Sequence, residues 1–461
     1  MNTVEIDAVH PLMTEGPRLT VEPPATRYDK QGDLPDGERA ARAVRQFVRD
    51  FGATAATWLE SCIHCGQCAE ACHYYVQTGE AKYTPVWKLE PFKQAYKREA
   101  GPFAPLYRAL NLKRDVSAAE LESWQELIYD SCTLCGRCSL ICPMGIDLAS
   151  LISQARHGMA KAGLVPHELW AVAERASVEG SPLGATPKVF RERCEWLADE
   201  HNVAIHVDLP EADILVSMSS IEIMKYPDSI VATARILNYL GTSWTFRTDG
   251  YEATNFGMLS GNTDWQRESS LRLINAAVAC KAKRLILPEC GHAYGALRWQ
   301  GANVYGQPLP FEVEHISEFL AREMQAGHLP VKPMPASVTF HDPCQISRRG
   351  GATQAPRVVL DKLGVDLHEM EMHGNLNWCC GGGGGVVTIH RADALRYKVF
   401  QLKMRQVEDT GASMLVSSCS NCRQTFDDGQ AHFHWDKTMH SLLELVADHL
   451  IEPAASKENA A

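Results

Sequence analysis

Residues 62–72 read CIHCGQCAEAC, and residues 132–143 read CTLCGRCSLICP. Both runs follow the spacing C-x2-C-x2-C-x3-C. Three closely spaced thiolates can wrap one face of an iron–sulfur cubane, while the fourth cysteine, on the helix that follows, reaches the other cluster. The spacing therefore predicts two [4Fe–4S] clusters with crossed ligand sets. These sets are Cys62, Cys65, Cys68 and Cys142 for one cluster, and Cys72, Cys132, Cys135 and Cys138 for the other.

Each run also contains a glycine, Gly66 or Gly136, that lets the loop backbone approach a cluster and direct N–H groups at sulfur. Zinc is the alternative occupant, but two matching four-cysteine runs favour clusters. Neither run contains C-x-x-C-H, so covalent haem is not indicated. The runs differ after their last cysteine, where Pro143 follows one and His73 the other. His73 either caps the turn or donates a hydrogen bond to a cluster sulfur, and the sequence leaves both roles open.

The composition restricts the cellular setting. The 461 residues carry a formal charge of −11, which argues against general nucleic-acid binding. No apolar run approaches the ~20 residues that span a bilayer. The N-terminus lacks the basic start and apolar core of a secretory signal. We therefore expect a cytoplasmic protein that is attached peripherally to the cytoplasmic membrane through partners. In that reducing compartment, we expect the sixteen cysteines to serve as metal ligands or redox groups and not as structural disulfides.

Periodicity divides the chain into six segments. Strand-like ADILVSM and KRLILPEC alternate with helix-like RESSLRLINAAVACKA, and the alternation returns from ASVTFHDPC onward, which is typical of α/β units. The expected segments are a disordered or partner-binding arm (1–36), a helical two-cluster domain (37–160), a helical linker (161–204), two α/β units (205–325 and 326–452) and a flexible tail (453–461).

A second cysteine pattern lies in the last unit, where residues 377–387 read NWCCGGGGGVV. The pattern comprises Cys344, Cys379, Cys380, Cys419 and Cys422. Adjacent cysteines form a disulfide only with strain, and five converging thiolates exceed what one simple cubane needs. The glycines that follow, with Gly381, Gly382 and Gly383 as cofactor-binding candidates, are predicted to let the backbone wrap an inorganic centre and to leave space for a substrate sulfur.

The preceding unit aligns with this one. When Ser220 is placed on Cys344, Asn255 falls where Cys379 stands, and Cys290 matches Cys419. The alignment predicts a duplicated unit whose first copy has lost its site, because a single thiol cannot hold a cluster. The predicted fold class is multidomain α+β, with an N-terminal α-helical two-cluster ferredoxin domain followed by a duplicated α/β domain.

Together these motifs resemble the CCG domain of heterodisulfide reductases, joined to a two-cluster ferredoxin module as in their membrane-linked catalytic subunit. The resemblance covers roughly residues 55–450. It looks still closer to the K subunit of the membrane complex that accompanies dissimilatory sulfite reductase, through the single intact CCG motif and the Cys-His of the first run. It implies that the five CCG cysteines hold a [4Fe–4S] or non-cubane centre that attacks or reduces a sulfur–sulfur bond.

The resemblance further implies a membrane cytochrome b-type partner linked to the quinone pool, and a disulfide, trisulfide or thiol substrate, either small or carried by a sulfur-carrier protein. Reduction needs protons, and His341 and Asp342 beside Cys344 are candidate sources, although an ordinary strand-end turn would also explain them. Arg348 and Arg349 either offset the negative charge of a cluster, steer a partner, or are simply exposed.

Two other functions stay open at this point. One is an electron relay without substrate chemistry, as in the iron–sulfur subunits of glycolate and lactate oxidases; the other is a zinc-binding scaffold. Five intact CCG cysteines favour catalysis over relay. No G-x-G-x-x-G follows a strand, so we expect no flavin or nucleotide in this chain. His292 is expected to be structural, Cys194 and Cys280 to be inert buried thiols, and the role of Cys290 stays open.

Overall fold

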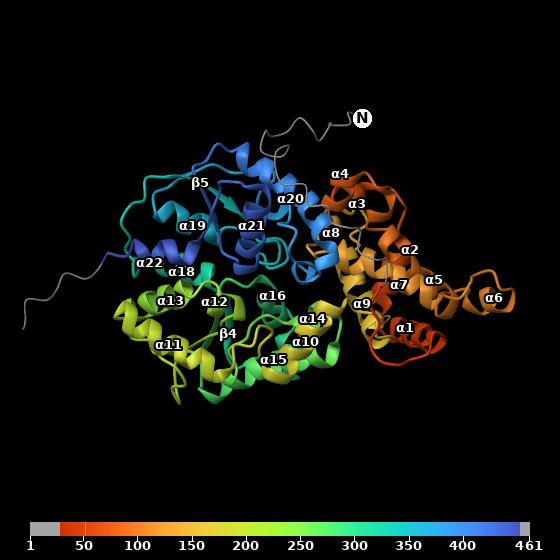
Figure 1. Ribbon diagram of the computed structural model, residues 1–461, viewed down its shortest axis with the longest axis horizontal. Helices are drawn as coiled ribbons and strands as arrows, with labels where there is room; N and C mark the ends of the chain where they lie inside the picture. Colours follow the sequence, from red (N-terminus) through yellow and green to blue (C-terminus); the bar gives the residue numbers. More distant parts are fainter. Residues whose placement is uncertain (1–27, 51, 452–461) are drawn as a thin grey trace, which may run out of the picture.

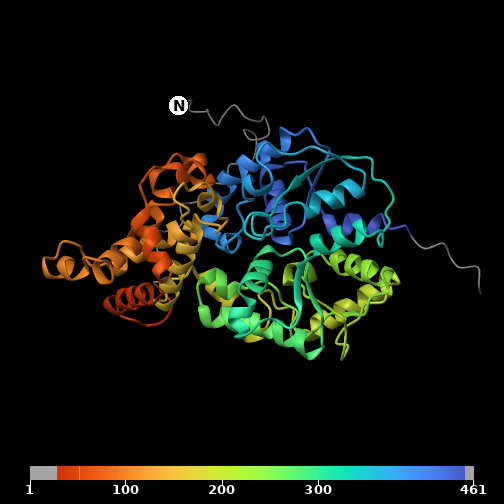
Figure 2. The same cartoon turned by 180° about the vertical axis from the view of Figure 1, so that it is seen from behind.

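The computed structural model describes residues 28–50 and 52–451, so most of the predicted arm and the predicted tail lie outside the described part. The chain forms a helical module at one end and two α/β units at the other (Figure 1). Figure 2 shows the same arrangement from behind. The fold is thus mixed helix and parallel sheet, with the helical part N-terminal, as predicted.

The helical module forms because its helices bury apolar faces on one another. Ala43 and Phe47 recur at helical spacing in α1 and are fully buried, and α1 packs on α9 with the Phe47 ring against Gly158. The helices are α1 (Asp36–Asp50), α2 (Ala53–Ser61), α3 (Gln67–Glu70), α4 (His73–Thr78), α5 (Glu90–Glu99), α6 (Ala104–Ala109), α7 (Ala118–Gln125), α8 (Arg137–Ile141) and α9 (Leu148–Lys161).

The described end of the predicted arm is held by the chain itself. The backbone N–H of Gln31 donates to the carbonyl of Gly163 at 2.8 Å, and the side-chain amide of Gln31 donates to the carbonyl of Val165 at 2.7 Å. The predicted linker contains α10 (His167–Glu179) and α11 (Pro187–His201). Helix α11 begins after Thr186, whose side chain accepts a hydrogen bond from the N–H of Val189.

The first α/β unit has a parallel sheet with the strand order β2-β1-β3-β4. Strands β1 and β3 coincide with two predicted strands, and Ile214 pairs with Trp244 on one side and Arg284 on the other. The elements are β1 (Ile214–Val216), α12 (Ser220–Met224), α13 (Asp228–Tyr239), β2 (Trp244–Thr245), α14 (Phe256–Ser260), α15 (Thr263–Ala279), β3 (Arg284–Leu287), α16 (Gly291–Tyr294), α17 (Gly301–Tyr305), β4 (Glu312–His315) and α18 (Ile316–Gln325).

The second α/β unit has a parallel sheet with the order β6-β5-β7-β8, which corresponds strand for strand to the first. This correspondence supports the duplicated unit, which stays a prediction. Loops gather at the carboxyl ends of parallel strands, so Cys344 after β5 and Cys419 after β7 meet at one edge. The elements are β5 (Ser337–His341), α19 (Ala355–Lys362), β6 (Asp366–Leu367), α20 (Asp393–Glu408), β7 (Met414–Ser417), α21 (Ser420–Phe433), β8 (Met439–Ser441) and α22 (Leu442–Asp448).

The two α/β units share one apolar core. Ile214 and Ile286 of the first sheet belong to the same buried cluster as Val338 and Val416 of the second. Helix α13 packs on α22, and α18 packs on α19 (Figure 1). The units therefore bury their apolar faces against each other, which fixes the relative position of their loop edges. Within residues 28–50 and 52–451, no helix combines the length and apolar character needed to cross a membrane.

Replacing Gly158 by alanine should destabilise the helical module. A Cβ at this position would lie 2.1 Å from the Phe47 ring, and overpacking of this kind costs about 1–3 kcal/mol. We expect a lower midpoint of thermal unfolding for anaerobically purified Gly158→Ala protein. Gly37→Ala is the matched control, because a Cβ there in α1 meets nothing within 4 Å. Equal midpoints for both variants would contradict the α1–α9 packing.

Candidate iron–sulfur centres

The two four-cysteine runs fold into loops of the same backbone shape. His64 and Gly66 have positive φ angles of 55° and 81°, and the corresponding Leu134 and Gly136 have 54° and 73°. Residues of alternating handedness turn successive N–H groups into a concavity that binds negative charge. Each loop is therefore preformed for an anionic group, and each leads directly into a short helix, α3 or α8.

The structure brings the ferredoxin cysteines together in two groups. One cavity is lined by Cys62, Cys65, Cys68 and Cys142. A second cavity is lined by Cys72, Cys132, Cys135 and Cys138. The fourth cysteine of each run thus crosses to the other loop, because α3 and α8 pack side by side.

The five CCG cysteines converge at the carboxyl ends of β5 and β7. Cys344 follows β5, and Cys419 is the N-cap residue of α21. All five thiols are buried. The Sγ atoms of Cys344 and Cys379 lie 3.8 Å apart, and the N–H of Gly381 donates to Cys379 Sγ at 3.4 Å.

A thiol of the second ferredoxin run reaches the CCG set. The side chain of Cys135 packs against the buried cluster that includes Cys379, and the two thiols interact electrostatically. Cys379 also contacts Cys344 and Cys380, and Cys380 contacts Cys422. The thiols thus form an unbroken series that runs from a ferredoxin cysteine into the CCG set.

His73 takes a role that the sequence did not suggest. It is buried, and its ring is hydrogen-bonded to the backbone of Cys379 in the other domain. Nearby, the guanidinium of Arg137 stacks on the ring of Trp378 at 3.5 Å and donates to the carbonyl of Leu376 at 3.0 Å. Side chains of the helical module therefore hold the loop that carries the cysteine pair.

Arg348 makes the reciprocal connection. Its guanidinium donates to the carbonyl of Cys135 at 3.1 Å and to the carbonyl and amide oxygens of Asn377 at 2.8–2.9 Å. Arg349 pairs with Asp147 at 3.3 Å, close to the start of α9. Of the three roles left open for these arginines, simple exposure does not describe Arg348.

The glycine run is the place where the second α/β unit meets the ferredoxin loop. A Cβ on Gly384 would lie 2.8 Å from the backbone of Thr133, and a Cβ on Gly382 would lie 1.9 Å from Thr425 Oγ1. Gly384 also has a φ of +64°, which favours glycine. Close approach of protein to protein thus requires glycine here, in addition to the predicted approach to a centre.

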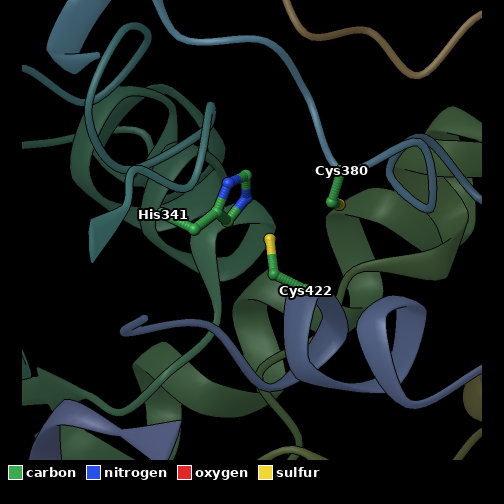
Figure 3. Close-up of side chains that lie close together, drawn as sticks. All are labelled: His341, Cys380 and Cys422. Atoms are coloured by element: carbon green, nitrogen blue, oxygen red, sulfur yellow. The ribbon is translucent and has the colours of Figure 1, made fainter. Parts of the chain in front are cut away.

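His341 is isolated from the polar groups that could satisfy it. Its side chain is fully buried, and neither ring nitrogen has a hydrogen-bond partner among the described residues. A ring nitrogen lies within 4.8 Å of the Sγ atoms of Cys380 and Cys422 (Figure 3). Burial lowers the pKa of His341 well below its usual value, so the ring is neutral. An imidazole in this position can bind a metal or donate one N–H to a group held by these thiols.

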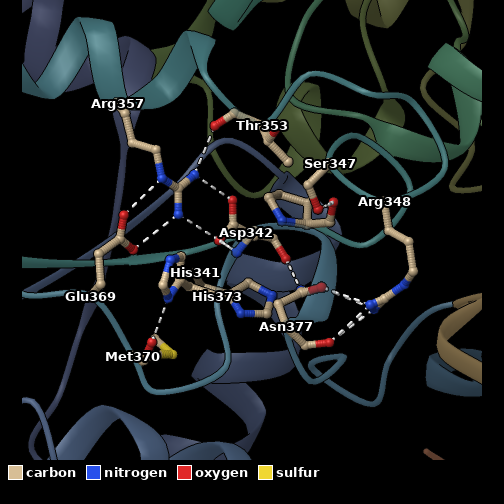
Figure 4. A network of polar contacts seen from close by, with 12 residues as sticks. His341, Asp342, Ser347, Arg348, Thr353, Arg357, Glu369, Met370, His373 and Asn377 are labelled. Atoms are coloured by element: carbon tan, nitrogen blue, oxygen red, sulfur yellow. Dashed lines mark hydrogen bonds and ion pairs between the residues drawn. The ribbon is translucent and has the colours of Figure 1, made fainter. Parts of the chain in front are cut away.

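Asp342 serves as an anchor for the neighbouring loop (Figure 4). Its oxygens accept hydrogen bonds from Arg357 at 2.7 and 2.9 Å and from the N–H of Gly374 at 2.6 Å. Arg357 also binds both oxygens of Glu369. Both carboxylate oxygens of Asp342 are therefore engaged, and they hold the segment that leads to Cys379.

Three buried cationic side chains lie beside these sites, where they would attract negatively charged groups. The sequence motifs did not indicate any of these three cations. Lys88 lies 3.9 Å from Cys72 Sγ, Arg156 lies beside the second ferredoxin loop, and Lys403 lies among the CCG cysteines. None of the three forms an ion pair with a carboxylate in the described part of the chain. Burial lowers the pKa of Lys403 to about 8. Because uncompensated buried cations are costly, thiolate-bound clusters are chemically suited to these sites.

The motifs match known domain families. Residues 58–146 match the 4Fe-4S dicluster domain, and residues 338–427 match the cysteine-rich CCG domain. The D subunit of dihydromethanophenazine:CoB–CoM heterodisulfide reductase from Methanosarcina barkeri is 27% identical over 419 residues, 89% of this chain and 98% of the relative. An Hdr-like menaquinol oxidoreductase iron–sulfur subunit from Archaeoglobus fulgidus is 25% identical, covering 86% of this chain and 80% of the relative.

The chain thus has a 4Fe-4S dicluster domain and a CCG domain, and over most of its length it is similar to heterodisulfide reductase-like iron–sulfur subunits. An EtfAB:quinone oxidoreductase from Syntrophomonas wolfei is also similar, with 27% identity over 83% of this chain and 56% of the relative. These relatives support an iron–sulfur electron-transfer protein of the oxidoreductase class. The closer resemblance to the K subunit stays a prediction.

The chain also buries carboxylates where its two α/β units meet. Glu222 accepts hydrogen bonds from the N–H groups of Ser219 at 2.9 Å and Glu289 at 3.3 Å. Ser219 Oγ lies 3.4 Å from the hydroxyl of Ser420, which stands between Cys419 and Cys422 in the sequence. Burial raises the pKa of Glu222 to about 7 and raises that of Glu289 as well.

The pKa of Glu222 predicts a pH-dependent stability. Its folded value of about 7 exceeds the unfolded value of 4.5, so the folded state binds more protons between these limits. The free energy of unfolding should therefore fall as pH rises through this window, by up to about 3 kcal/mol. Glu222→Gln should lose this contribution in denaturant titrations between about pH 5.5 and 7.5. The exposed Glu200→Gln is the control, and equal slopes in all three proteins would be inconsistent with a buried, protonated Glu222.

Proposed function

We propose that this chain is the catalytic electron-transfer subunit of a heterodisulfide reductase-like complex. It would exchange electrons between a membrane cytochrome b-type partner linked to the quinone pool and a disulfide, trisulfide or thiol sulfur substrate. The contact between Cys135 and Cys379 carries the proposal, because it makes the second ferredoxin site a direct neighbour of the CCG site. The similarity to the D subunit of a heterodisulfide reductase supports it.

The order of the two ferredoxin sites along the path follows from their exposure. Cys65 is exposed, and the neighbouring Ile63 is 62% exposed, so the first ferredoxin site is open to an external electron partner. The second site is closed off by the CCG domain through Arg348 and His73. Electrons would therefore pass between partner and substrate by way of the first site and then the second. When bound, iron–sulfur clusters supply the one-electron steps that sulfur–sulfur chemistry uses in pairs.

A cavity beside the CCG cysteines fits the proposed substrate. It encloses about 210 Å³ between the two α/β units, with Cys290 and His292 on one side and Gly382 and Ser420 on the other. Burial lowers the pKa of His292 to about 4, and its Nε2 accepts a hydrogen bond from the N–H of Gly384 at 3.3 Å. No Lys or Arg lines this cavity within the described residues. It therefore suits an uncharged sulfur group better than a sulfonate or a phosphate.

The chain's own residues take distinct roles in this proposal. The five CCG cysteines hold the centre, and the neutral ring of His341 contributes a nitrogen ligand or an N–H donor beside Cys380 and Cys422. Asp342 positions the cysteine-pair loop through Arg357 and Gly374. This division departs from the expectation that Asp342 supplies protons, since its oxygens already accept three hydrogen bonds.

Anaerobic EPR beside an iron count tests the proposal. We expect more iron than two four-iron clusters hold, and a paramagnetic signal of the oxidised protein that changes when a thiol or disulfide is added. Cys379→Ser should abolish this signal and leave the reduced ferredoxin signals in place. Cys194→Ser is the matched control, because Cys194 is a buried thiol in α11, outside the cysteine cluster. Iron for two clusters only, with no thiol response, would instead favour the electron relay.

A further inference from the structure

The helical module carries a hairpin that projects away from the rest of the molecule. It spans residues 97–114, from the end of α5 through a turn at Gly101 to the short helix α6 and the loop after it. In both views α6 forms the far tip of the module, on the side remote from the α/β units (Figures 1 and 2). Neither the cluster sites nor the proposed substrate cavity uses this hairpin.

The hairpin exposes an unusual number of large apolar side chains. Phe103 is 61% exposed, Leu106 49%, Leu110 60% and Leu112 59%. The first three are spaced so that they share one side of the helical turn, and the ring of Tyr107 lies edge-on to Phe103 at 6.4 Å. Four such side chains on one small projection form an apolar tip that none of the described residues covers.

The same hairpin is a basic island in an acidic protein. Residues 97–114 contain five Lys or Arg and one Glu, whereas the whole chain has a net charge of −11. Lys97 and Lys113 form no ion pair with the residues described. Arg114 pairs with Glu120 at 2.9 Å but stays 72% exposed, and exposed pairs of this kind are weak. The charge is therefore complementary to a negatively charged surface.

We propose that the hairpin at 97–114 docks directly on a bilayer that contains anionic lipids. The apolar tip enters the boundary between headgroups and acyl chains, and the flanking Lys and Arg side chains contact the headgroups. An apolar face bordered by basic residues is the pattern of interfacial segments that lie in a membrane surface without crossing it. A narrow projection suits a bilayer, because lipid molecules can pack around each inserted side chain. This contact goes beyond the proposed redox function and does not depend on it.

The hairpin is close to the first ferredoxin site, so the proposed membrane contact would also position the site where electrons enter. Helix α5 leads from the first ferredoxin loop, where Lys93 Nζ lies 3.2 Å from His64 Nε2, to the hairpin turn. Gly101 lies eight positions after Lys93, and most of this stretch is helix α5, so the two are separated by about 12 Å at the helical rise. A hairpin seated in the membrane would therefore hold the exposed cluster site of Cys65 near the bilayer surface.

Flotation of the anaerobic holoprotein with protein-free vesicles tests the proposal. The probes are vesicles of phosphatidylcholine alone and vesicles that also contain phosphatidylglycerol. We expect binding to the anionic vesicles that weakens as salt is raised. Replacing all four apolar tip residues by serine should reduce this binding by at least about tenfold. Lys97→Glu with Lys113→Glu should reduce it too and remove most of its salt dependence.

A matched control carries Val178→Ser and Trp196→Ser, which are 78% and 51% exposed elsewhere on the surface. This control should bind vesicles like the unaltered chain. Unchanged EPR spectra and unfolding midpoints show that each variant is folded and loaded. Equal vesicle binding by the tip variant and the control would overturn the proposal. Absence of binding to protein-free vesicles would also overturn it, and tip-dependent binding to membranes containing a partner protein would then assign the hairpin to that protein.

Discussion

One buried cation connects all parts of the molecule. Arg156 in α9 is fully buried, and its guanidinium donates to carbonyls of the helical module and of both α/β units, namely those of Ile128, Cys132, Leu259 and Gly384. Hydrogen bonds satisfy its donors, but no carboxylate among the described residues balances its charge. A buried charge without compensation costs several kcal/mol. A thiolate-bound cluster at Cys132 would supply the missing negative charge. Cluster binding at this site and the packing of the helical module on the two α/β units are therefore expected to stabilise each other.

The joint around Arg156 is also the proposed electron path. Gly384 approaches Thr133 so closely that a side chain would not fit, and Cys135 touches Cys379 beside it. The hydrogen bonds of Arg348 and His73 cross the same joint. The features that join the domains thus bring two redox sites together, and a change that loosens the fold here would also separate the sites. The projecting hairpin lies at the opposite end of the module, so the proposed membrane contact and the proposed sulfur site are at opposite ends of the molecule (Figure 1).

The features that depend on the spacing of residues close together in the chain are the ones that can be predicted from the sequence. Cysteine spacing predicts how the ferredoxin thiols are grouped, because each loop is short and its geometry repeats. Continuous apolar runs predict the central strands β1, β3, β5 and β7, whereas the two-residue edge strands β2 and β6 have no such run. The buried cations Lys88, Arg156 and Lys403 could not be predicted, since each is buried by segments distant in the chain. For His341, its place beside Cys344 indicates the right neighbourhood, but its lack of partners is visible only in three dimensions.

The second ferredoxin site and the CCG site are direct neighbours, and the proposed function depends on this contact. Spin relaxation of the CCG signal, measured by EPR with the ferredoxin clusters oxidised and then reduced, tests it most directly. We predict faster relaxation when the clusters are reduced. The effect should persist in Cys68→Ser, which alters the distant site, and disappear in Cys138→Ser, which alters the adjacent one. Relaxation that is the same in both redox states of the unaltered protein would contradict the contact on which the proposed function rests.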